Sequence, residues 1–518
     1  MIPTNPFAAV PVLMISPVDS DLRCLLEEAH GLVMGCPALL TLIETDLDAH
    51  GLQKKATRAA DQRWKEERGL VLPNCEVEYE TRELVTLTLE QGRPRTPAYV
   101  VFLAVLLRGY FGEGFKACDA ATLMIESTTI GLLFANLGIA RPRASTLTEL
   151  VNAVTVATRQ RILDAQIAQV LKLGWDDFKD MLQDSTHVEG NTKWPTDSRL
   201  IVALLSRLLR VGASLATMDL PVIKPQSVRR LLATIKRLDR EIDMTRGTKE
   251  GTRTRRRRYE KLLWRARRAL KTMGEVVGAV EAALLVLDVA PSRHAMATRV
   301  VARMRSDVTT LGTVITNCEA RVIEGKKVPM AAKTLSISDP DVGFIAKGQR
   351  DPVIGYKPQV ARSGKGFITG LLLPQGNAAD SDHLVPMVDE VIRRTKVVPE
   401  RVSTDDGYAS KANVDALHER HIKVVSISGS KGKALTADAD WISDAYAEAR
   451  DMRSAVESLM FTIKQGFHFG EVARRGLLAV HNELLEKVLA YNLCHLTRMR
   501  RAKALAASRE AAWLKAAA

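Results

Sequence analysis

The stretch VSTDDGYASKANVDALHERHIKVVSI, residues 402–427, determines the fold class that we predict. Residues 402–404 predict a short strand that ends at Asp405, residues 411–420 have the apolar spacing of a helix, and residues 422–427 predict another strand. A strand, a helix and a strand in succession are typical of an α/β domain. We therefore expect this part of the chain to form a sheet with helices packed against it.

The α/β pattern extends upstream of this stretch. Residues 353–360 and 367–373 predict neighbouring strands joined by the turn Ser363-Gly364-Lys365-Gly366, and residues 380–394 predict a helix. Residues 178–184 predict a first strand that carries Asp184 at its end. Helical periodicity fills residues 198–320, so we expect a helical block inserted within one α/β domain.

Length and charge indicate a large basic protein with polyanionic partners. The chain of 518 residues is long enough for two to four domains, and 74 Lys and Arg against 60 Asp and Glu give a formal charge of +14. Residues 224–271 alone hold 18 basic and 5 acidic side chains, so 18 − 5 = +13. Such an excess favours nucleic acid first and acidic membrane surfaces second.

The cysteines and the apolar runs exclude several other classes. The 6 cysteines are scattered, without a CxxC pair or a Cys/His cluster, which argues against a zinc site and a disulfide framework. A reduced, cytoplasmic setting fits them best. No run reaches the roughly 18 apolar residues of a membrane span. We expect no membrane segment and no secretion signal.

These patterns divide the chain into consecutive regions. A turn over residues 245–252, with Gly247 and Gly251, predicts a helical hairpin in the basic block. A strand-like piece is expected at 75–80 and a linker at 92–97. The predicted regions are a mostly helical N-terminal region (1–90), a helical domain of a DNA-binding type or a plain packing domain (91–172), the α/β domain (173–197 and 330–505), the basic helical insertion (198–329) and an Ala/Lys/Arg-rich tail (506–518).

Three acidic residues have settings that suit metal chemistry. Asp184 and Asp405 each follow a predicted strand, and Glu457 lies within a predicted helix over residues 445–465. Spacings of four and seven residues place Glu457 on one helical face with Arg453 and Lys464. Cleavage of a phosphodiester uses two Mg²⁺ ions about 3.5–4 Å apart, and Mg²⁺ prefers oxygen ligands. The alternative to a metal site is that the two aspartates only form turns at strand ends and that Glu457 only makes a solvated ion pair with Arg453.

Several segments, taken in order, resemble one protein family. They are Asp184-Ser185-Thr186-His187-Val188-Glu189 followed by Trp194-Pro195-Thr196-Asp197, Gly355-Tyr356-Lys357, Gly376-Asn377-Ala378-Ala379-Asp380, Asp405-Asp406-Gly407-Tyr408, and Arg453-x3-Glu457-x6-Lys464. Together they resemble the DDE transposases of bacterial insertion sequences, closest to the ISNCY-type branch of the YREK-bearing superfamily. One departure is Arg450, which stands where the family has tyrosine. The resemblance covers roughly residues 90–195 and 335–500.

This resemblance implies a fold, a site and a reaction. The fold would be RNase H-like, a five-stranded mixed sheet with helices on both faces. Asp184, Asp405 and Glu457 would be catalytic and would hold two Mg²⁺ ions, with Mn²⁺ as a substitute. The enzyme would cleave transposon ends and transfer the 3′-OH into target DNA, as a homodimer on double-stranded DNA in the bacterial cytoplasm, associated with the nucleoid. Asp406 and Glu189 are the nearest competitors as ligands.

Arginines and lysines in two places are candidate DNA contacts. Arg453 and Lys464 would hold phosphates near the cut. The basic insertion would grip DNA phosphates, and its candidate residues are Arg253, Arg255, Arg256, Arg257, Arg258, Arg265 and Arg268. A solvated helical arm is the plain alternative. For the whole chain, the alternatives are a catalytically inactive, transposase-derived DNA-binding protein and a helical scaffold that binds RNA or acidic membranes.

Overall fold

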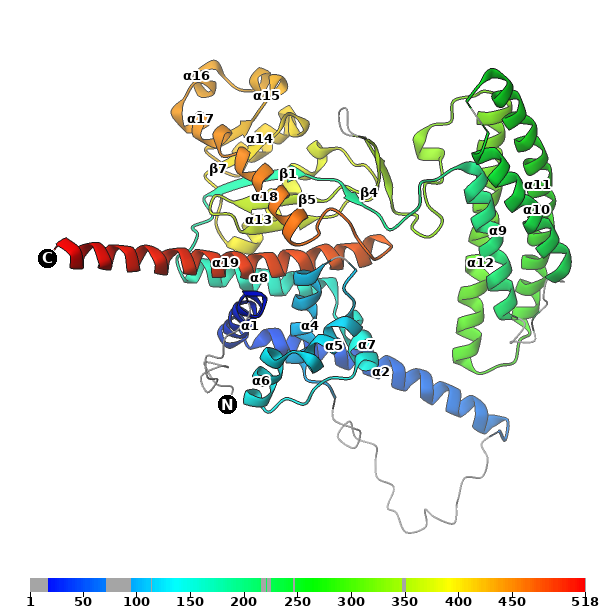
Figure 1. Ribbon diagram of the computed structural model, residues 1–518, viewed down its shortest axis with the longest axis horizontal. Helices are drawn as coiled ribbons and strands as arrows, with labels where there is room; N and C mark the ends of the chain where they lie inside the picture. The colour runs from blue at the N-terminus through cyan, green and yellow to red at the C-terminus, as the bar shows by residue number, and fades with distance from the viewer. Residues whose placement is uncertain are drawn as a thin grey trace, which may run out of the picture. The chain divides into compact units, whose positions relative to one another are not determined.

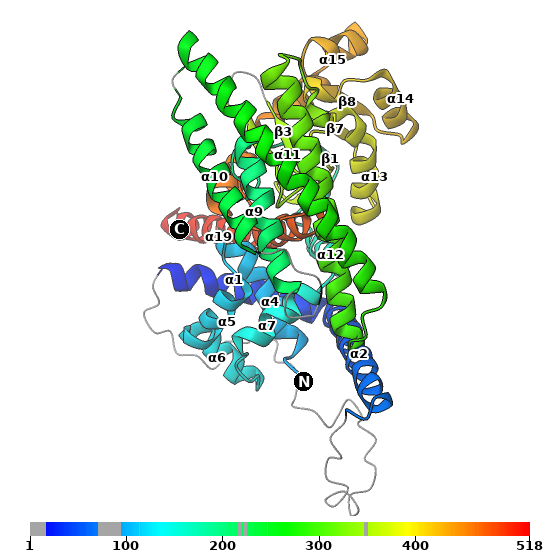
Figure 2. The same cartoon turned by 90° about the vertical axis from the view of Figure 1, so that its right-hand side faces the viewer.

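The computed structural model describes residues 17–70, 95–112, 114–215, 220, 225–245, 247–346 and 351–517. The strand-like piece expected at 75–80 and the start of the linker expected at 92–97 lie outside these ranges. The chain divides into two compact units, shown in two views (Figures 1 and 2). One unit comprises Met1–His50, Leu89–Asn191 and Asp341–Ala518, and the other comprises Gly51–Thr88 and Thr192–Pro340.

A five-stranded sheet is the centre of the first unit (Figure 1). Its middle strand, β1 (Asp180–Ser185), is antiparallel to β5 (Gln359–Ser363) and parallel to β7 (Arg401–Thr404). The outer strands are β6 (Ile368–Leu372) beside β5 and β8 (Val424–Ile427) beside β7. The order β6-β5-β1-β7-β8 therefore contains both orientations, in agreement with the five-stranded mixed sheet that the resemblance implies.

A smaller sheet has the order β2-β4-β3 and is formed by β2 (Val188–Glu189), β4 (Val353–Tyr356) and β3 (Gly343–Ile345). The expectation of one continuous strand over residues 353–360 is wrong. Pro358 has no N–H to donate to a ladder, so the chain leaves the small sheet after Tyr356 and enters the large sheet at Gln359.

Helices cover both faces of the large sheet. Successive strand residues point to opposite faces, and α13 (Leu384–Thr395) and α14 (Lys411–Glu419) pack on the face that carries Met181 and Val402. On the opposite face, Arg401 pairs with Glu448 of α17 (Asp444–Asp451). Arg362 on that face donates a hydrogen bond to the carbonyl of Ala455 in α18 (Ser454–Gly466).

The long helix α19 (Leu477–Ala517) covers the β6 edge of the sheet. The Asn492 side chain accepts a hydrogen bond from Ile368 N and donates one to Ile368 O, both at 2.9 Å. This amide satisfies an edge strand that would otherwise expose unpaired backbone groups. The tail expected to begin at residue 506 continues α19 as helix through Ala517.

The remaining helices of the first unit pack near α19. They are α1 (Pro17–Gly35), the start of α2 (Ala38–Glu67), α4 (Ala98–Phe111), α5 (Ala117–Glu126), α6 (Thr128–Leu137), α7 (Ala144–Ala153) and α8 (Val156–Lys172). Glycine at 109 in α4 allows close contact with α19, because a Cβ there would lie 1.9 Å from the Glu486 carbonyl oxygen. No single helix in the described ranges is long and apolar enough to cross a membrane; the bent pairs α1–α2 and α5–α6 meet that test by length and composition alone.

The second unit contains a bundle of α9 (Asp197–Leu215), α10 (Pro225–Asp243), α11 (Lys249–Leu285) and α12 (Pro291–Cys318), side by side in both views (Figures 1 and 2). Leu204, Leu262 and Met304 are among the buried side chains at its centre. The helices α10 and α11 meet at the turn expected from the glycines, which confirms the predicted hairpin.

Short elements complete the two units. They are the π-helix Glu319–Ile323, the 3-10 helices Met330–Ala332, Asp380–His383 and Asp406–Tyr408, and the helices α15 (Ser430–Leu435) and α16 (Asp438–Trp441).

We predict that Asp164→Asn destabilises the first unit at neutral pH. Asp164 in α8 accepts hydrogen bonds from Arg393 and Arg394 of α13, and its side chain is only 18% exposed. Burial raises the pKa of this carboxyl, but the hydrogen bonds from the two arginines outweigh it and leave the pKa below its ordinary value. The ionised form therefore stabilises the fold above the unfolded pKa of about 4, and this stabilisation is lost as the pH falls through the folded pKa.

The expected loss is about 1–3 kcal/mol at pH 7, measured by urea denaturation of the full chain, and it should shrink progressively below pH 4. Asp389→Asn is the matched control, because Asp389 pairs with Arg420 but is 52% exposed. An exposed pair contributes about 0–1 kcal/mol. Equal losses in the two variants, or a loss for Asp164→Asn that does not depend on pH, would contradict the prediction.

Candidate active site

The parallel pairing of β1 with β7 brings two of the three candidate carboxylates side by side. Leu182 is paired with Ser403, so Asp184 and Asp405 occupy equivalent positions two residues further along. Neighbouring strands lie about 4.8 Å apart. Both aspartates are half-buried. Asp405 immediately follows β7, and its carboxylate accepts a hydrogen bond from Gly407 N at 2.9 Å.

The third candidate, Glu457, lies on α18, which covers the face toward which Asp184 and Asp405 point. Its side chain is 66% exposed, and a carboxylate oxygen lies 3.4 Å from a guanidinium nitrogen of Arg453. Across the described ranges, no three His, Cys, Asp or Glu side chains gather closely enough to hold a metal ion. The structure thus pairs the two aspartates and leaves Glu457 beside Arg453 on the adjacent helix.

The single helix expected over residues 445–465 is wrong. α17 ends at Asp451 and α18 begins at Ser454, with a turn at residues 452–453. Arg450 therefore belongs to a different helix from Glu457. Its guanidinium lies 5.7 Å from the centre of the Trp441 ring. Arg453 and Lys464 remain near the two ends of α18, with Lys464 in its last turn.

The two competing carboxylates have structural surroundings of their own. Asp406 accepts hydrogen bonds from Lys431 N at 2.9 Å and Gly432 N at 3.0 Å, so it caps the start of α15. Glu189 is exposed on β2 of the smaller sheet, and its backbone pairs with Gly355. These surroundings favour Asp405 over Asp406 and Asp184 over Glu189.

A buried polar network lies on the α13 face of the sheet, next to the paired aspartates. The Gln359 amide donates to Asp380 at 2.7 Å and accepts a hydrogen bond from the Tyr408 hydroxyl. Lys357 lies 2.8 Å from the same Asp380 oxygen. Gln183 of β1 donates to Gln359 and to the carbonyl of His383. The network joins β1, β5 and the two loops that flank the aspartates.

Burial and hydrogen bonds shift the pKa values of Asp380 and Tyr408 in opposite directions. Burial raises the pKa of Asp380, but hydrogen bonds from Lys357 and Gln359 outweigh burial and leave the pKa below its ordinary value. Burial raises the pKa of Tyr408, and the carboxylates of Asp380, Asp184 and Asp405 raise it further. Tyr408 therefore stays protonated, as its hydrogen bond to Gln359 requires.

The sequence alone predicts no role for the residues of this network. Lys357, Asp380 and Tyr408 stand out in the sequence only as parts of the segments that resemble the family. The available signal is that Gln183 and Gln359 alternate onto the same strand faces as the buried Met181 and Ala361, because a buried amide needs polar partners.

The arginines of the basic insertion fall into two groups. Arg258 donates to the carbonyl of Glu241 at 2.6 Å and Arg255 to the carbonyl of Thr245 at 2.7 Å, so both fasten α11 to the end of α10. Arg256 lies 3.4 Å from Glu260 on the same helix, an exposed pair. The second group is exposed and includes Arg253 and Arg257.

Further along α11, an open groove of about 420 Å³ lies between α10 and α11. Arg230, Arg265 and Arg268 line it together with Trp264, whose side chain is 59% exposed. The Arg265 guanidinium lies 5.6 Å from the centre of the Trp264 ring. Trp264 thus faces solvent among cations, whereas Tyr259 is buried in the bundle.

Comparison with known proteins gives one match. Residues 312–493 match the family model described as Transposase DDE domain, a range that includes Asp405 and Glu457 and begins after Asp184. Neither the curated proteins nor the solved structures contain a match to the chain. Members of this family generally use divalent metal ions, and the five-stranded mixed sheet is consistent with the RNase H-like fold that the family implies. The match supports the interpretation of the chain as a DDE transposase.

Proposed function

We propose that this protein cleaves DNA at the ends of a mobile element and transfers the freed 3′-OH into target DNA. The observation that supports this most is the parallel register of β1 and β7, which sets Asp184 and Asp405 side by side on the face covered by α18. Glu457 on α18 is the third carboxylate of the proposed site. The resemblance to the ISNCY-type, YREK-bearing transposases rests on the segments quoted above.

The donor set fits a hard divalent cation. Asp184, Asp405 and Glu457 supply only carboxylate oxygens, which Mg²⁺ prefers and Mn²⁺ accepts. Two bound ions would activate water and stabilise the leaving oxygen of the phosphodiester. The chain itself orients the ligands: the Gly407 N–H holds the Asp405 carboxylate, and the Gln359 network fixes the strand ends.

Cations of the site and of the bundle would bind the DNA. Arg453 lies beside Glu457, where it would pair with a DNA phosphate near the cut. Lys464, in the last turn of α18, would contact the DNA strand further from the cut. The exposed Arg253 and Arg257 and the groove arginines Arg265 and Arg268 would bind backbone phosphates of the transposon end or the target. Two ends must be joined, so we propose a homodimer on DNA.

Asp405→Asn should abolish nicking and leave DNA binding intact, because it removes a negative ligand without changing the shape of the side chain. The assay is Mg²⁺-dependent nicking of duplexes that carry the element's terminal repeats, with gel shift as the binding measurement. A bound metal ion contributes several kcal/mol of transition-state stabilisation, so loss of one ligand should lower the rate at least about 100-fold. Asp406→Asn is the matched control and should retain nicking, since Asp406 caps α15.

Loss of activity in Asp406→Asn alone would reverse the choice of ligand. Wild-type protein that binds the repeats but does not nick them with Mg²⁺ or Mn²⁺ would support the inactive DNA-binding alternative.

Glu457→Gln should abolish nicking without lowering thermal stability. The Glu457 side chain is two-thirds exposed, and an exposed i,i+4 pair with Arg453 contributes at most about 0.5 kcal/mol. The paired measurements are the nicking rate and the unfolding midpoint. Glu448→Gln is a suitable control on α17, because Glu448 is 65% exposed and pairs with Arg401. Unchanged nicking in Glu457→Gln would remove this residue from the site.

The double variant Arg253→Gln/Arg257→Gln should weaken DNA binding and flatten its dependence on salt. Each lost phosphate contact reduces the slope of log K against log salt by about 0.9. Fluorescence anisotropy with a labelled duplex at several salt concentrations measures the slope. Arg299→Gln/Arg303→Gln on α12 makes the same change in net charge with exposed arginines. Equal slopes in both double variants would contradict DNA contact by these arginines and favour the alternative of a solvated helical arm.

A further inference from the structure

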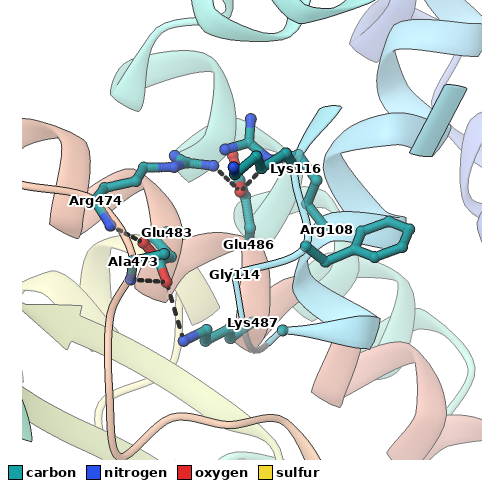
Figure 3. Close-up of a pocket in the computed structure, with 10 residues that line it drawn as sticks. Arg108, Gly114, Lys116, Ala473, Arg474, Glu483, Glu486 and Lys487 are labelled. Atoms are coloured by element: carbon teal, nitrogen blue, oxygen red, sulfur yellow. Dashed lines mark hydrogen bonds and ion pairs between the residues drawn. The ribbon is translucent and has the colours of Figure 1, made fainter. Parts of the chain in front are cut away.

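A small cationic pocket of about 150 Å³ lies in the first unit, apart from the paired aspartates (Figure 3). It is enclosed by the end of α4, the start of α5, residues 473–474 and α19. Lys116 and Ala473 at its rim are exposed, so the pocket opens to solvent. The charged residues that line it are Arg108, Lys116, Arg474, Lys487, Glu483 and Glu486.

The pocket has more cations than its carboxylates can neutralise. Four basic and two acidic side chains line it, so 4 − 2 = +2. Glu486 is also shared with Arg159, which donates to one of its oxygens at 2.7 Å from outside the pocket lining. Figure 3 shows the side chains of Arg474 and Arg108 converging on the same carboxylate. The single carboxylate of Glu486 is therefore shared by the guanidinium groups of Arg159, Arg474 and Arg108.

Arg108 is the least satisfied of the three. Its side chain is 9% exposed, and its Nε lies 3.6 Å from the Glu486 carboxylate, beyond hydrogen-bond distance. Within the described residues, Arg108 Nε and Nη1 are buried without a hydrogen-bond partner. Buried donors of a charged group are costly when they are left unpaired. Arg108 thus lines the pocket with a guanidinium that Glu486 pairs only at long range.

The second carboxylate is already engaged. Glu483 accepts hydrogen bonds from Ala473 N at 3.0 Å and Arg474 N at 2.9 Å, and it lies 3.2 Å from the ammonium of Lys487. Lys487 is itself 2% exposed and donates to the carbonyls of His468 and Glu471. Burial lowers the pKa of Lys487, which an added negative charge nearby would counteract.

We propose that this pocket binds a phosphate group, with Arg108, Lys116 and Arg474 as its charged donors. A phosphate offers several acceptor oxygens, matches the planar fork of a guanidinium and compensates the excess positive charge. The phosphate belongs either to a nucleic-acid backbone or to a free phosphate ester. The proposal goes beyond the proposed DNA cleavage and does not depend on the paired aspartates.

The test is calorimetric titration of the full chain with sodium phosphate against chloride at constant ionic strength. We expect saturable binding of one phosphate per chain. Arg108→Gln should weaken it about tenfold or more, and Lys116→Gln, which changes an exposed side chain and so leaves folding intact, by about threefold to tenfold. Lys172→Gln, an exposed lysine of α8, is the matched control and should bind phosphate as the wild type does.

A second titration, with the chain saturated by duplex DNA, identifies the source. Phosphate binding that disappears under DNA assigns the pocket to the nucleic-acid backbone, and binding that persists assigns it to a free phosphate ester. Absence of saturable phosphate binding, or equal affinity in the wild type, Arg108→Gln and Lys116→Gln, would overturn the proposal. Because no divalent ion or cleavage enters the titration, that failure would leave the proposed catalytic site unaffected.

Discussion

The position of β1 between β5 and β7 is the constraint on which the rest of the first unit depends. Its parallel register with β7 decides that Asp184 and Asp405 end on the same face of the sheet. Its antiparallel register with β5 brings Gln183 toward Gln359, and this pair links the two loops beside the aspartates. A shift of one residue in either pairing would turn every side chain of β1 to the opposite face.

Most of the sheet could be predicted from the sequence, and the two errors have local causes. The alternation of short apolar runs with helical spacing identified the strands on both sides of the insertion. The strand predicted over residues 353–360 is too long because it joins the apolar residues 353–356 to Val360 across Pro358, which interrupts the ladder. The helix predicted over residues 445–465 has no glycine or proline at the break between α17 and α18. Tyr446 on α17 and Val456 on α18 are both buried, so tertiary packing overrides the local helical pattern.

The candidate site was less predictable than the sheet, because the choice between neighbouring residues depends on the direction in which each side chain points. Asp405 and Asp406 are identical in type and adjacent, and only the cap of α15 shows that Asp406 points elsewhere. The arginines of α11 pose the same difficulty: composition cannot separate Arg258, which fastens the hairpin, from Arg257, which faces solvent. The buried Gln359 network also depends on contacts between segments far apart in the chain.

The insertion after β1 also affects the timing of folding during synthesis. Both neighbours of β1 are encoded beyond the bundle, so the middle strand has no partner when it leaves the ribosome. Asp405 follows Asp184 by 405 − 184 = 221 residues. At about 5–20 residues per second, that interval lasts on the order of 10–40 s. The bundle can fold within it, whereas Asp184 and Asp405 can pair only after residue 405 of 518 has been made, so a product truncated before β7 cannot assemble the proposed DNA-cutting site.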